Sequence, residues 1–244
     1  MLPIIQIGGA AIQTPGLILI AGIWIGLSVA EKYANLNKIK GEQLYNLSFL
    51  VLVAGILGAR LSVMIRFPSA FLDNPSSIIS LNPSLLDPVG GIAIALAAGL
   101  VYSQRKKMNL LNTLDALVLA LAVMGIAIPL ANLASGNAFG APTNLPWGIE
   151  LWGYERHPTQ IYQALGGIVI LWLVWPARQR KKNPAGLIFT NFIILTAGSI
   201  LFLAAFRGDS VIIWKGWRLE QLVAWIILAF SLWGYSTILQ PKKS

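Results

Sequence analysis

Cysteine is absent from this sequence, and histidine occurs only once. The chain therefore cannot form a disulfide bond, a thiolate metal site or a cysteine nucleophile, and a metal centre with several histidines is impossible. Charged residues are also scarce: they make up 11% of the 244 residues, against about 25% in an ordinary globular protein. So few charges could not cover the surface of a water-soluble protein of this size.

Hydrophobic residues, by contrast, make up 56% of the chain, and the mean hydropathy is +0.70. A chain of this length could not bury that much apolar surface in a single core. Intrinsic disorder is excluded as well, because disordered chains are poor in hydrophobic residues and rich in charge. The composition therefore predicts an integral membrane protein.

Seven apolar stretches are long enough, or nearly so, to cross a bilayer as helices of about 20 residues. We place them at residues 9–30, 45–65, 88–104, 113–134, 160–177, 186–206 and 219–239. The chain contains no internal repeat or low-complexity tract, so we expect residues 1–244 to form a single transmembrane domain. The predicted fold class is an all-α integral membrane protein, a seven-transmembrane-helix bundle with short outward-facing arms, the longest at 66–87 and 135–159.

The net charge of +9 could suggest a nucleic-acid partner, but the positions of the basic residues argue against it. Most of them lie in alternate loops and at the C-terminus: Lys32, Lys38, Lys40, Arg105, Lys106, Lys107, Arg178, Arg180, Lys181, Lys182, Lys242 and Lys243. The positive-inside rule assigns such loops to the cytoplasm. We therefore expect the N-terminus outside, the C-terminus in the cytoplasm, and no nucleic-acid binding.

Several cations lie near the outer ends of the predicted spans. Arg60 lies five residues inside its span, ~8 Å deep at 1.5 Å per residue. Its side chain either extends to the headgroups or binds a lipid phosphate from within the bundle. Arg207 either forms an interfacial ion pair with Asp209 or contributes to the same anion site. The remaining outer cations, which we interpret as interface anchors that extend the positive patch, are Arg66, Lys215 and Arg218.

The single histidine, His157, has the only side chain whose unperturbed pKa lies near neutrality. It either forms a polar lead-in to the helix that begins at Pro158, or acts as a general base or phosphate partner. Amides near the same ends usually hydrogen-bond between helices, and paired glycines usually mark close helix packing. These residues are Asn132, Gln160, Gln163 and Gln221, and Gly90 and Gly91.

The motifs occur in a distinctive order: Gly58-Ala59-Arg60-Leu61, Gly90-Gly91, Asn132…Gly136…Gly140, Arg156-His157-Pro158-Thr159-Gln160-Ile161-Tyr162, Phe206-Arg207-Gly208-Asp209 and Gln221. This order resembles the prolipoprotein diacylglyceryl transferase family over nearly the whole chain. The run from His157 to Tyr162 is its most specific element. The resemblance also implies seven spans with the N-terminus outside.

The resemblance implies a reaction at the outer leaflet of the bacterial inner (plasma) membrane. The family transfers the diacylglyceryl group of phosphatidylglycerol to the lipobox cysteine thiol of a prolipoprotein, in lipoprotein biosynthesis, without a metal or redox cofactor. The implied partners are phosphatidylglycerol, or another anionic phospholipid, and the prolipoprotein signal segment. The implied catalytic residues are His157, Arg60 and Arg207. The implied substrate-binding residues are Asn132, Gly90, Gly91, Gly136, Gly140, Gln160, Tyr162, Asp209 and Gln221.

The chain departs from the family pattern at six positions, several of which carry charged or ionisable residues in the family. These are Pro15, Val89, Pro129, Asn137, Ile200 and Ala204. Three hypotheses follow: a divergent transferase with a reduced site, a non-catalytic relative that binds phospholipid or lipoprotein signal segments, and a small transporter or channel. The last is disfavoured because no clear acid or base lies near the membrane midplane. A single outward cavity that gathers Arg60, Arg207 and His157 would favour the first hypothesis.

Overall fold

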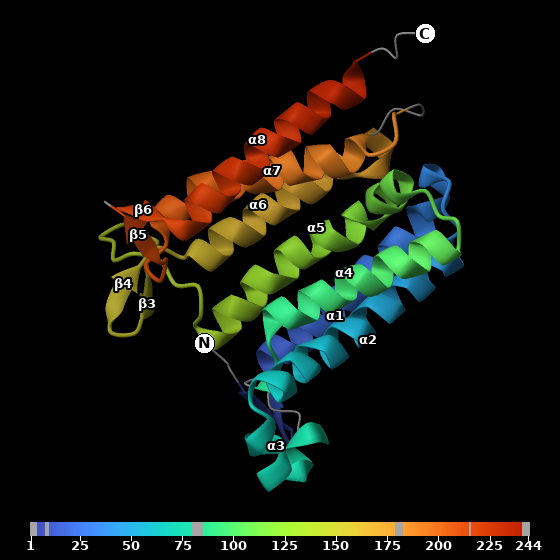
Figure 1. Cartoon of the computed structure of the whole chain (residues 1–244). Coiled ribbons are helices and arrows are strands. Elements are labelled where there is room, and N and C mark those ends of the chain that lie inside the picture. The colour runs from blue at the N-terminus through green and yellow to red at the C-terminus, as the bar shows by residue number, and fades with distance from the viewer. Residues whose placement is uncertain (1–3, 8–9, 80–84, 179–182, 215, 241–244) are drawn as a thin grey trace.

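A bundle of long helices makes up most of the computed structural model, which describes residues 4–7, 10–79, 85–178, 183–214 and 216–240 (Figure 1). Although some of the predicted ends differ by several residues, each predicted apolar stretch overlaps one of these helices. They are α1 (Thr14–Tyr33), α2 (Gly41–Arg66), α4 (Pro88–Arg105), α5 (Leu110–Ser135), α6 (Thr159–Val174), α7 (Leu187–Leu203) and α8 (Leu219–Leu239).

Five helical segments within the described ranges are long enough and apolar enough to cross a membrane. They are Thr14–Asn37, Gly41–Arg66, Leu110–Ser135, Leu187–Phe206 and Leu219–Leu239. Helix α6 is equally apolar but has only 16 residues. The chain is therefore an α-helical membrane protein. Five of the basic residues behind the predicted orientation, namely Arg180, Lys181, Lys182, Lys242 and Lys243, lie outside the described residues, as does the expected outer cation Lys215.

The predicted first span begins too early. Strand β2 (Ala10–Gln13) pairs with β1 (Ile4–Ile7) in an antiparallel hairpin, so α1 starts only at Thr14. Pro15 lies in the first turn of α1, where its missing N–H removes no helical hydrogen bond. The proline therefore marks the true start of this helix, which hydropathy alone had predicted to begin at residue 9.

Helix α5 is the shared wall of the bundle (Figure 1). It packs against α1 on one side and α6 on the other, while α2 pairs with α4 and α7 lies between α6 and α8. Small residues permit the close contacts: a Cβ on Gly22 of α1 would lie 2.4 Å from the Cβ of Ala127 in α5. Such packing drives helix association in membranes, where burial from water contributes little.

A buried carboxylate fixes α7 against α5. Asp115 is 5% exposed and accepts hydrogen bonds from the backbone N–H groups of Gly186, at 2.6 Å, and Phe189, at 2.8 Å. The first N–H groups of a helix have no partner within the helix, and Gly186 has no side chain that could cap them. Asp115 therefore caps a helix that lies more than seventy residues away in the sequence.

Short elements cover the end of the bundle where α4, α6 and α8 begin, which we call the hairpin end (Figure 1). The segment 66–87 contains α3 (Pro68–Asp73) and the short helix Pro75–Ile79. The segment 135–159 contains the hairpin of β3 (Ile149–Leu151) and β4 (Tyr154–Arg156), and β5 (Ile212–Trp214) pairs with β6 (Trp217–Arg218). The expected arms therefore include hairpins that helical periodicity could not reveal.

Candidate functional site

A cavity of about 680 Å³ opens between α5, α6, α7 and α8. This volume lies within the range of ~300–1,000 Å³ typical of ligand sites. Most of its lining is aliphatic, with residues such as Ile128, Ile170, Ile193 and Ile227. Its polar lining residues are Asn132, Gln163, Thr196, Ser199, Arg207 and Glu220. An apolar chamber with a few polar groups suits a ligand that is mostly hydrocarbon with a polar head.

Arg207 is the cation of this cavity. Its Nε and Nη2 donate to the two carboxylate oxygens of Asp209, at 2.9 and 3.0 Å, and its Nη1 lies 3.0 Å from Oε1 of Glu220. A guanidinium carries five N–H groups, so within the described residues two remain for a ligand. The expected pairing with Asp209 is present, and the second carboxylate was not expected from the sequence.

Three short segments form a small layer that includes Arg207, one of the residues lining this cavity. Residues 139–143 lie between 206–208 on one edge and 154–157 on the other. Ala141 donates its N–H to the carbonyl of Phe206, at 2.8 Å, and accepts from the N–H of His157, at 3.0 Å. The layer thus places His157 and Arg207 on opposite edges of one strand-like segment.

Gly140 is required at the centre of this layer. It forms a bridge with Arg207, and a Cβ at this position would lie 2.1 Å from the carbonyl oxygen of His157. Any side chain would therefore push the histidine segment away from the arginine segment. Gly136 has a different role, because it ends α5 in the left-handed conformation with a φ of 77°.

The imidazole of His157 packs in an aromatic cluster. Its ring centroid lies 5.2 Å from that of Phe206 and 6.2 Å from that of Tyr162, whose hydroxyl accepts a hydrogen bond from Nε1 of Trp147 at 2.7 Å. The Nδ1 atom is buried and has no hydrogen-bond partner among the described residues. The histidine thus lies beside Phe206, the neighbour of Arg207, although it does not itself line the cavity.

The two residues that follow Pro158 hold the loop after α5. Thr159 donates from Oγ1 to the carbonyl of Ala138, and Gln160 donates from Nε2 to the carbonyl of Asn137, both at 2.8 Å. Both side chains are fully buried. In the structure this part of the motif anchors a backbone turn, while Asn132 and Gln163 present amides to the cavity. Gln221 is half-buried, one residue after Glu220.

Arg60, Gly90 and Gly91 lie outside the cavity, on α2 and α4. Arg60 donates from Nη1 to the carbonyl of Ser77, at 2.8 Å, and so contacts the short helix Pro75–Ile79. A Cβ on Gly91 would lie 2.9 Å from that of Ala59, and one on Gly90 would lie 2.3 Å from that of Ser62. The structure thus gathers Arg207 and Asn132, sets His157 nearby, and does not include Arg60 in the lining.

Three positions that depart from the family pattern line this same cavity. They are Pro129 of α5, Ile200 of α7 and Ala204 at the end of α7. The others lie elsewhere: Val89 is 75% exposed on α4, Asn137 is exposed, and Pro15 begins α1. The cavity is therefore lined by two of the predicted site residues, Asn132 and Arg207, and by three of the departures, and its charge is concentrated in Arg207 and its two carboxylate partners.

Two cavity features were missing from the sequence-based site. Glu220 lies two residues after Arg218 in the first turn of α8, where an acid is favoured by the helix dipole. Thr196 and Ser199 are three residues apart and so share a face of α7. Their spacing was visible in the sequence, but nothing in it distinguished the cavity face of the helix from the lipid face.

Comparison with known proteins identifies similar chains. A family model described as prolipoprotein diacylglyceryl transferase matches residues 3–237. The phosphatidylglycerol–prolipoprotein diacylglyceryl transferase of Finegoldia magna is 31% identical, with 91% of this chain and 90% of the relative covered. The enzymes of the same name from Clostridioides difficile and Synechococcus elongatus are 27% and 24% identical; these matches cover 89% and 99% of this chain and 87% and 88% of the relatives.

Proposed function

Because the chain belongs to the prolipoprotein diacylglyceryl transferase family and is therefore a transferase, we propose that it transfers the diacylglyceryl group of phosphatidylglycerol to the lipobox cysteine of a prolipoprotein. The observation that carries this proposal is the cavity between α5 and α8, which combines an aliphatic lining with Arg207 and Asn132. A phospholipid has the matching distribution of hydrocarbon and anionic phosphate.

The depth of the cavity suits a lipid of one leaflet. Its lining on α5 runs from Asn132 to Ala122, ten residues deeper, which corresponds to ~15 Å along the helix. Half of a hydrocarbon core of ~30 Å has the same thickness. Acyl chains would lie along the aliphatic wall, and the phosphate would meet the two remaining N–H groups of Arg207.

The reaction requires a thiolate and a stabilised leaving group. The cysteine sulfur attacks the carbon of the diacylglyceryl unit that bears the phosphate ester, and a C–S bond forms. The bond between that carbon and the phosphate ester oxygen breaks, and glycerol phosphate leaves with the electron pair. We assign phosphate binding to Arg207, positioning of the polar head to Asn132, and acceptance of the thiol proton to His157. We assign Arg60 to positioning of the arm formed by residues 68–79, since it contacts Ser77.

The proposed membrane placement follows from the same assignment. Helices α1, α2, α4, α5, α6, α7 and α8 would all span the bacterial plasma membrane as one domain. The hairpin end would face outward, with the N-terminus outside and the C-terminus in the cytoplasm. The signal segment of the prolipoprotein would approach from within the bilayer, so that its cysteine reaches the three-segment layer beside Arg207.

The direct test uses a bacterial strain depleted of its own transferase. Expression of this chain should restore growth and produce thioether-linked diacylglyceryl prolipoprotein, detected by mass spectrometry of a reporter lipoprotein. Loss of rescue in Arg207→Ala and His157→Ala, with normal membrane insertion, would support the residue assignment. Absence of product from a well-expressed wild-type chain would refute the proposed reaction.

A non-catalytic lipid-binding relative is the second candidate. It is favoured by the pairing of Arg207 with Asp209 and Glu220 and by the apolar residues Pro129 and Ile200 in the cavity. In that case the purified protein would retain phosphatidylglycerol but yield no thioether product. The same depletion strain, together with a lipid analysis of the purified protein, separates the two functions.

A further inference from the structure

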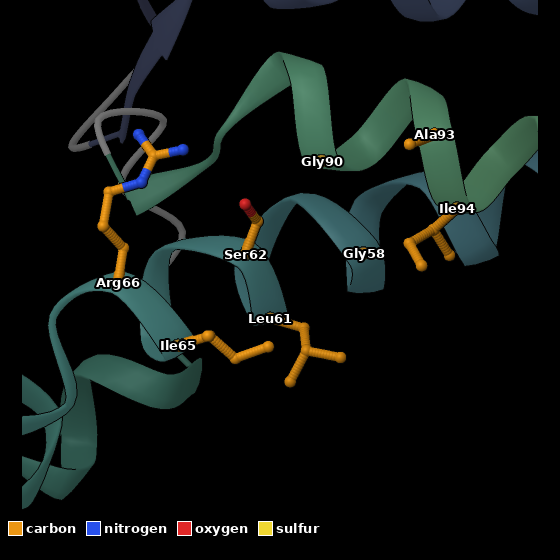
Figure 2. Close-up of a pocket in the computed structure, with 8 residues that line it drawn as sticks. All are labelled: Gly58, Leu61, Ser62, Ile65, Arg66, Gly90, Ala93 and Ile94. Carbon is orange, nitrogen blue, oxygen red and sulfur yellow. The ribbon is translucent and has the colours of Figure 1, made fainter.

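A second hollow lies on the α2–α4 pair (Figure 2), and none of its lining residues lines the cavity between α5 and α8. It has a volume of about 470 Å³ and is lined by Gly58, Leu61, Ser62, Ile65 and Arg66 of α2 and by Gly90, Ala93 and Ile94 of α4. We call it the α2–α4 groove. Leu61, Ile65 and Ile94 are all exposed, so the groove faces the surroundings of the bundle.

The groove has the length of a lipid chain in one leaflet. Arg66 lies at one end of the row of lining residues, and Gly58 and Ile94 lie at the other (Figure 2). Eight residues of α2 separate Arg66 from Gly58, which corresponds to ~12 Å along the helix. One leaflet contributes ~15 Å of hydrocarbon. The groove therefore spans most of the depth of one leaflet, with its cation at the hairpin end.

Close helix packing shapes this groove. A Cβ on Gly58 would lie 2.5 Å from the Cβ of Ile94, and one on Gly90 would lie 2.3 Å from the Cβ of Ser62. The two backbones therefore approach closely, and the larger aliphatic side chains stand on either side of the seam. The result is a long apolar furrow rather than a flat helical surface.

The charged groups at the hairpin end of the groove can bind an anion. Asp87 accepts hydrogen bonds from Ser62 Oγ, at 2.5 Å, and from the N–H groups of Val89 and Gly90, so its carboxylate is directed toward the start of α4. Arg66 is 61% exposed and, within the described residues, makes one ion pair, from Nη2 to Asp87 at 3.2 Å. The remaining N–H groups of its guanidinium are therefore available to a phosphate.

We propose that the α2–α4 groove binds one acyl chain of an anionic phospholipid whose phosphate contacts Arg66. The sequence suggested only an interface anchor for this arginine, and the groove beside it supplies the matching hydrocarbon site. The bound lipid is not in position to react, because the groove shares no lining residue with the cavity that contains Arg207 and Asn132. The site is formed by α2 and α4 and is independent of the proposed transferase reaction.

The absence of cysteine makes a direct test possible. Ala93→Cys places a single thiol in the groove, which can be labelled with a bimane fluorophore in vesicles of equal phosphatidylglycerol and phosphatidylcholine. Brominated phosphatidylglycerol should quench this label with roughly 5-fold higher apparent affinity than brominated phosphatidylcholine, the size expected for one basic side chain near an anionic lipid. The matched control is Ile92→Cys, which is exposed at the same depth but lies outside the groove.

Charge variants complete the test. Arg66→Gln should abolish the preference at the Ala93 label, and Arg66→Lys should retain most of it. Because the label itself occupies space, unlabelled protein from the same vesicles should also carry one more phosphatidylglycerol than Arg66→Gln in native mass spectrometry. Equal preference at positions 92 and 93, or an Ala93 preference that survives Arg66→Gln, would overturn the proposal. Neither measurement depends on transferase turnover.

Discussion

The cavity between α5 and α8 and the α2–α4 groove both combine an aliphatic wall with one arginine at the hairpin end, yet their chemistry differs. Arg207 is 22% exposed and is held by two carboxylates, whereas Arg66 is 61% exposed and pairs with one. The cavity also presents the amide side chains of Asn132 and Gln163, whereas the only uncharged polar side chain lining the groove, among the described residues, is Ser62, which donates to Asp87. A fixed, enclosed cation with polar neighbours can orient a reacting headgroup, while an exposed cation above a furrow can only retain a lipid.

The largest expected effect follows from loss of Arg207, the enclosed cation of the cavity. Arg207→Ala should reduce the rate of diacylglyceryl transfer by ~10²-fold or more, the loss typical of removing one preorganised donor to a developing anion. The measurement is thioether formation on a reporter peptide with purified protein. The matched control is Arg105→Ala, at the opposite end of α4, which should keep the wild-type rate. Equal rates in the two variants would mean that the cavity is not the reaction site.

The wall of the cavity should depend on Asp115. Asp115→Ala leaves the N–H groups of Gly186 and Phe189 without their acceptor, and each buried unsatisfied donor costs ~1–3 kcal/mol. Thermal unfolding in detergent should therefore show a clear loss of stability. Hydrogen exchange should rise first at the start of α7 and leave α2 and α4 unchanged. An even rise across all helices would contradict a local cap.

The three-segment layer offers a smaller structural test. Gly140→Ala introduces a Cβ 2.1 Å from the carbonyl oxygen of His157, and the forced backbone shift should cost ~1–3 kcal/mol. Gly198→Ala is the matched control, because nothing lies within 4 Å of its added Cβ and alanine favours the helix. Thermal melts of the two variants should move in opposite directions. A Gly140→Ala variant as stable as the wild type would show that the layer can adjust.

The smallest effect should appear at the groove as the pH falls. The hydrogen bond from Ser62, those from the backbone of Gly90 and Val89, and the charge of Arg66 together hold the pKa of Asp87 below its ordinary value, against desolvation. The ionised cap therefore contributes stability above the ordinary carboxyl pKa, and this contribution is lost as the pH falls through the lowered pKa. Hydrogen-exchange protection at residues 89–91, measured relative to the intrinsic exchange rate at each pH, should fall below about pH 4. Asp87→Asn should remove this pH dependence.

The sequence predicted the parts of the fold that follow from hydropathy and local chemistry. The seven helical stretches and the pairing of Arg207 with Asp209 could be predicted because each depends on residues close together in the chain. Contacts across the bundle could not. Nothing local links Asp115 to Gly186, Arg60 to Ser77, or Arg207 to Glu220, since each pair meets only after the helices have packed.

The positions of the candidate site residues could be predicted from the sequence only in part. His157 and Arg207 were correctly expected near the same end of the bundle, and the layer through Ala141 connects their segments. Arg60 was expected to join them, but its position on α2 directs it to the short helix Pro75–Ile79. The depth of a residue along one helix does not reveal which neighbouring helix its side chain faces. The sequence therefore grouped Arg60 with residues at a similar depth, although helix packing separates them.

The order of the helices along the chain has a consequence for biogenesis. Both walls of the α2–α4 groove can assemble once residues up to 105 have left the ribosome, whereas the cavity also needs α8, which begins only at residue 219. A nascent chain halted before residue 219 would already hold a lipid at Arg66 but would lack Glu220 and one entire side of the reaction chamber. A phospholipid could thus bind to the nascent chain before the cavity in which we propose the transfer reaction has formed.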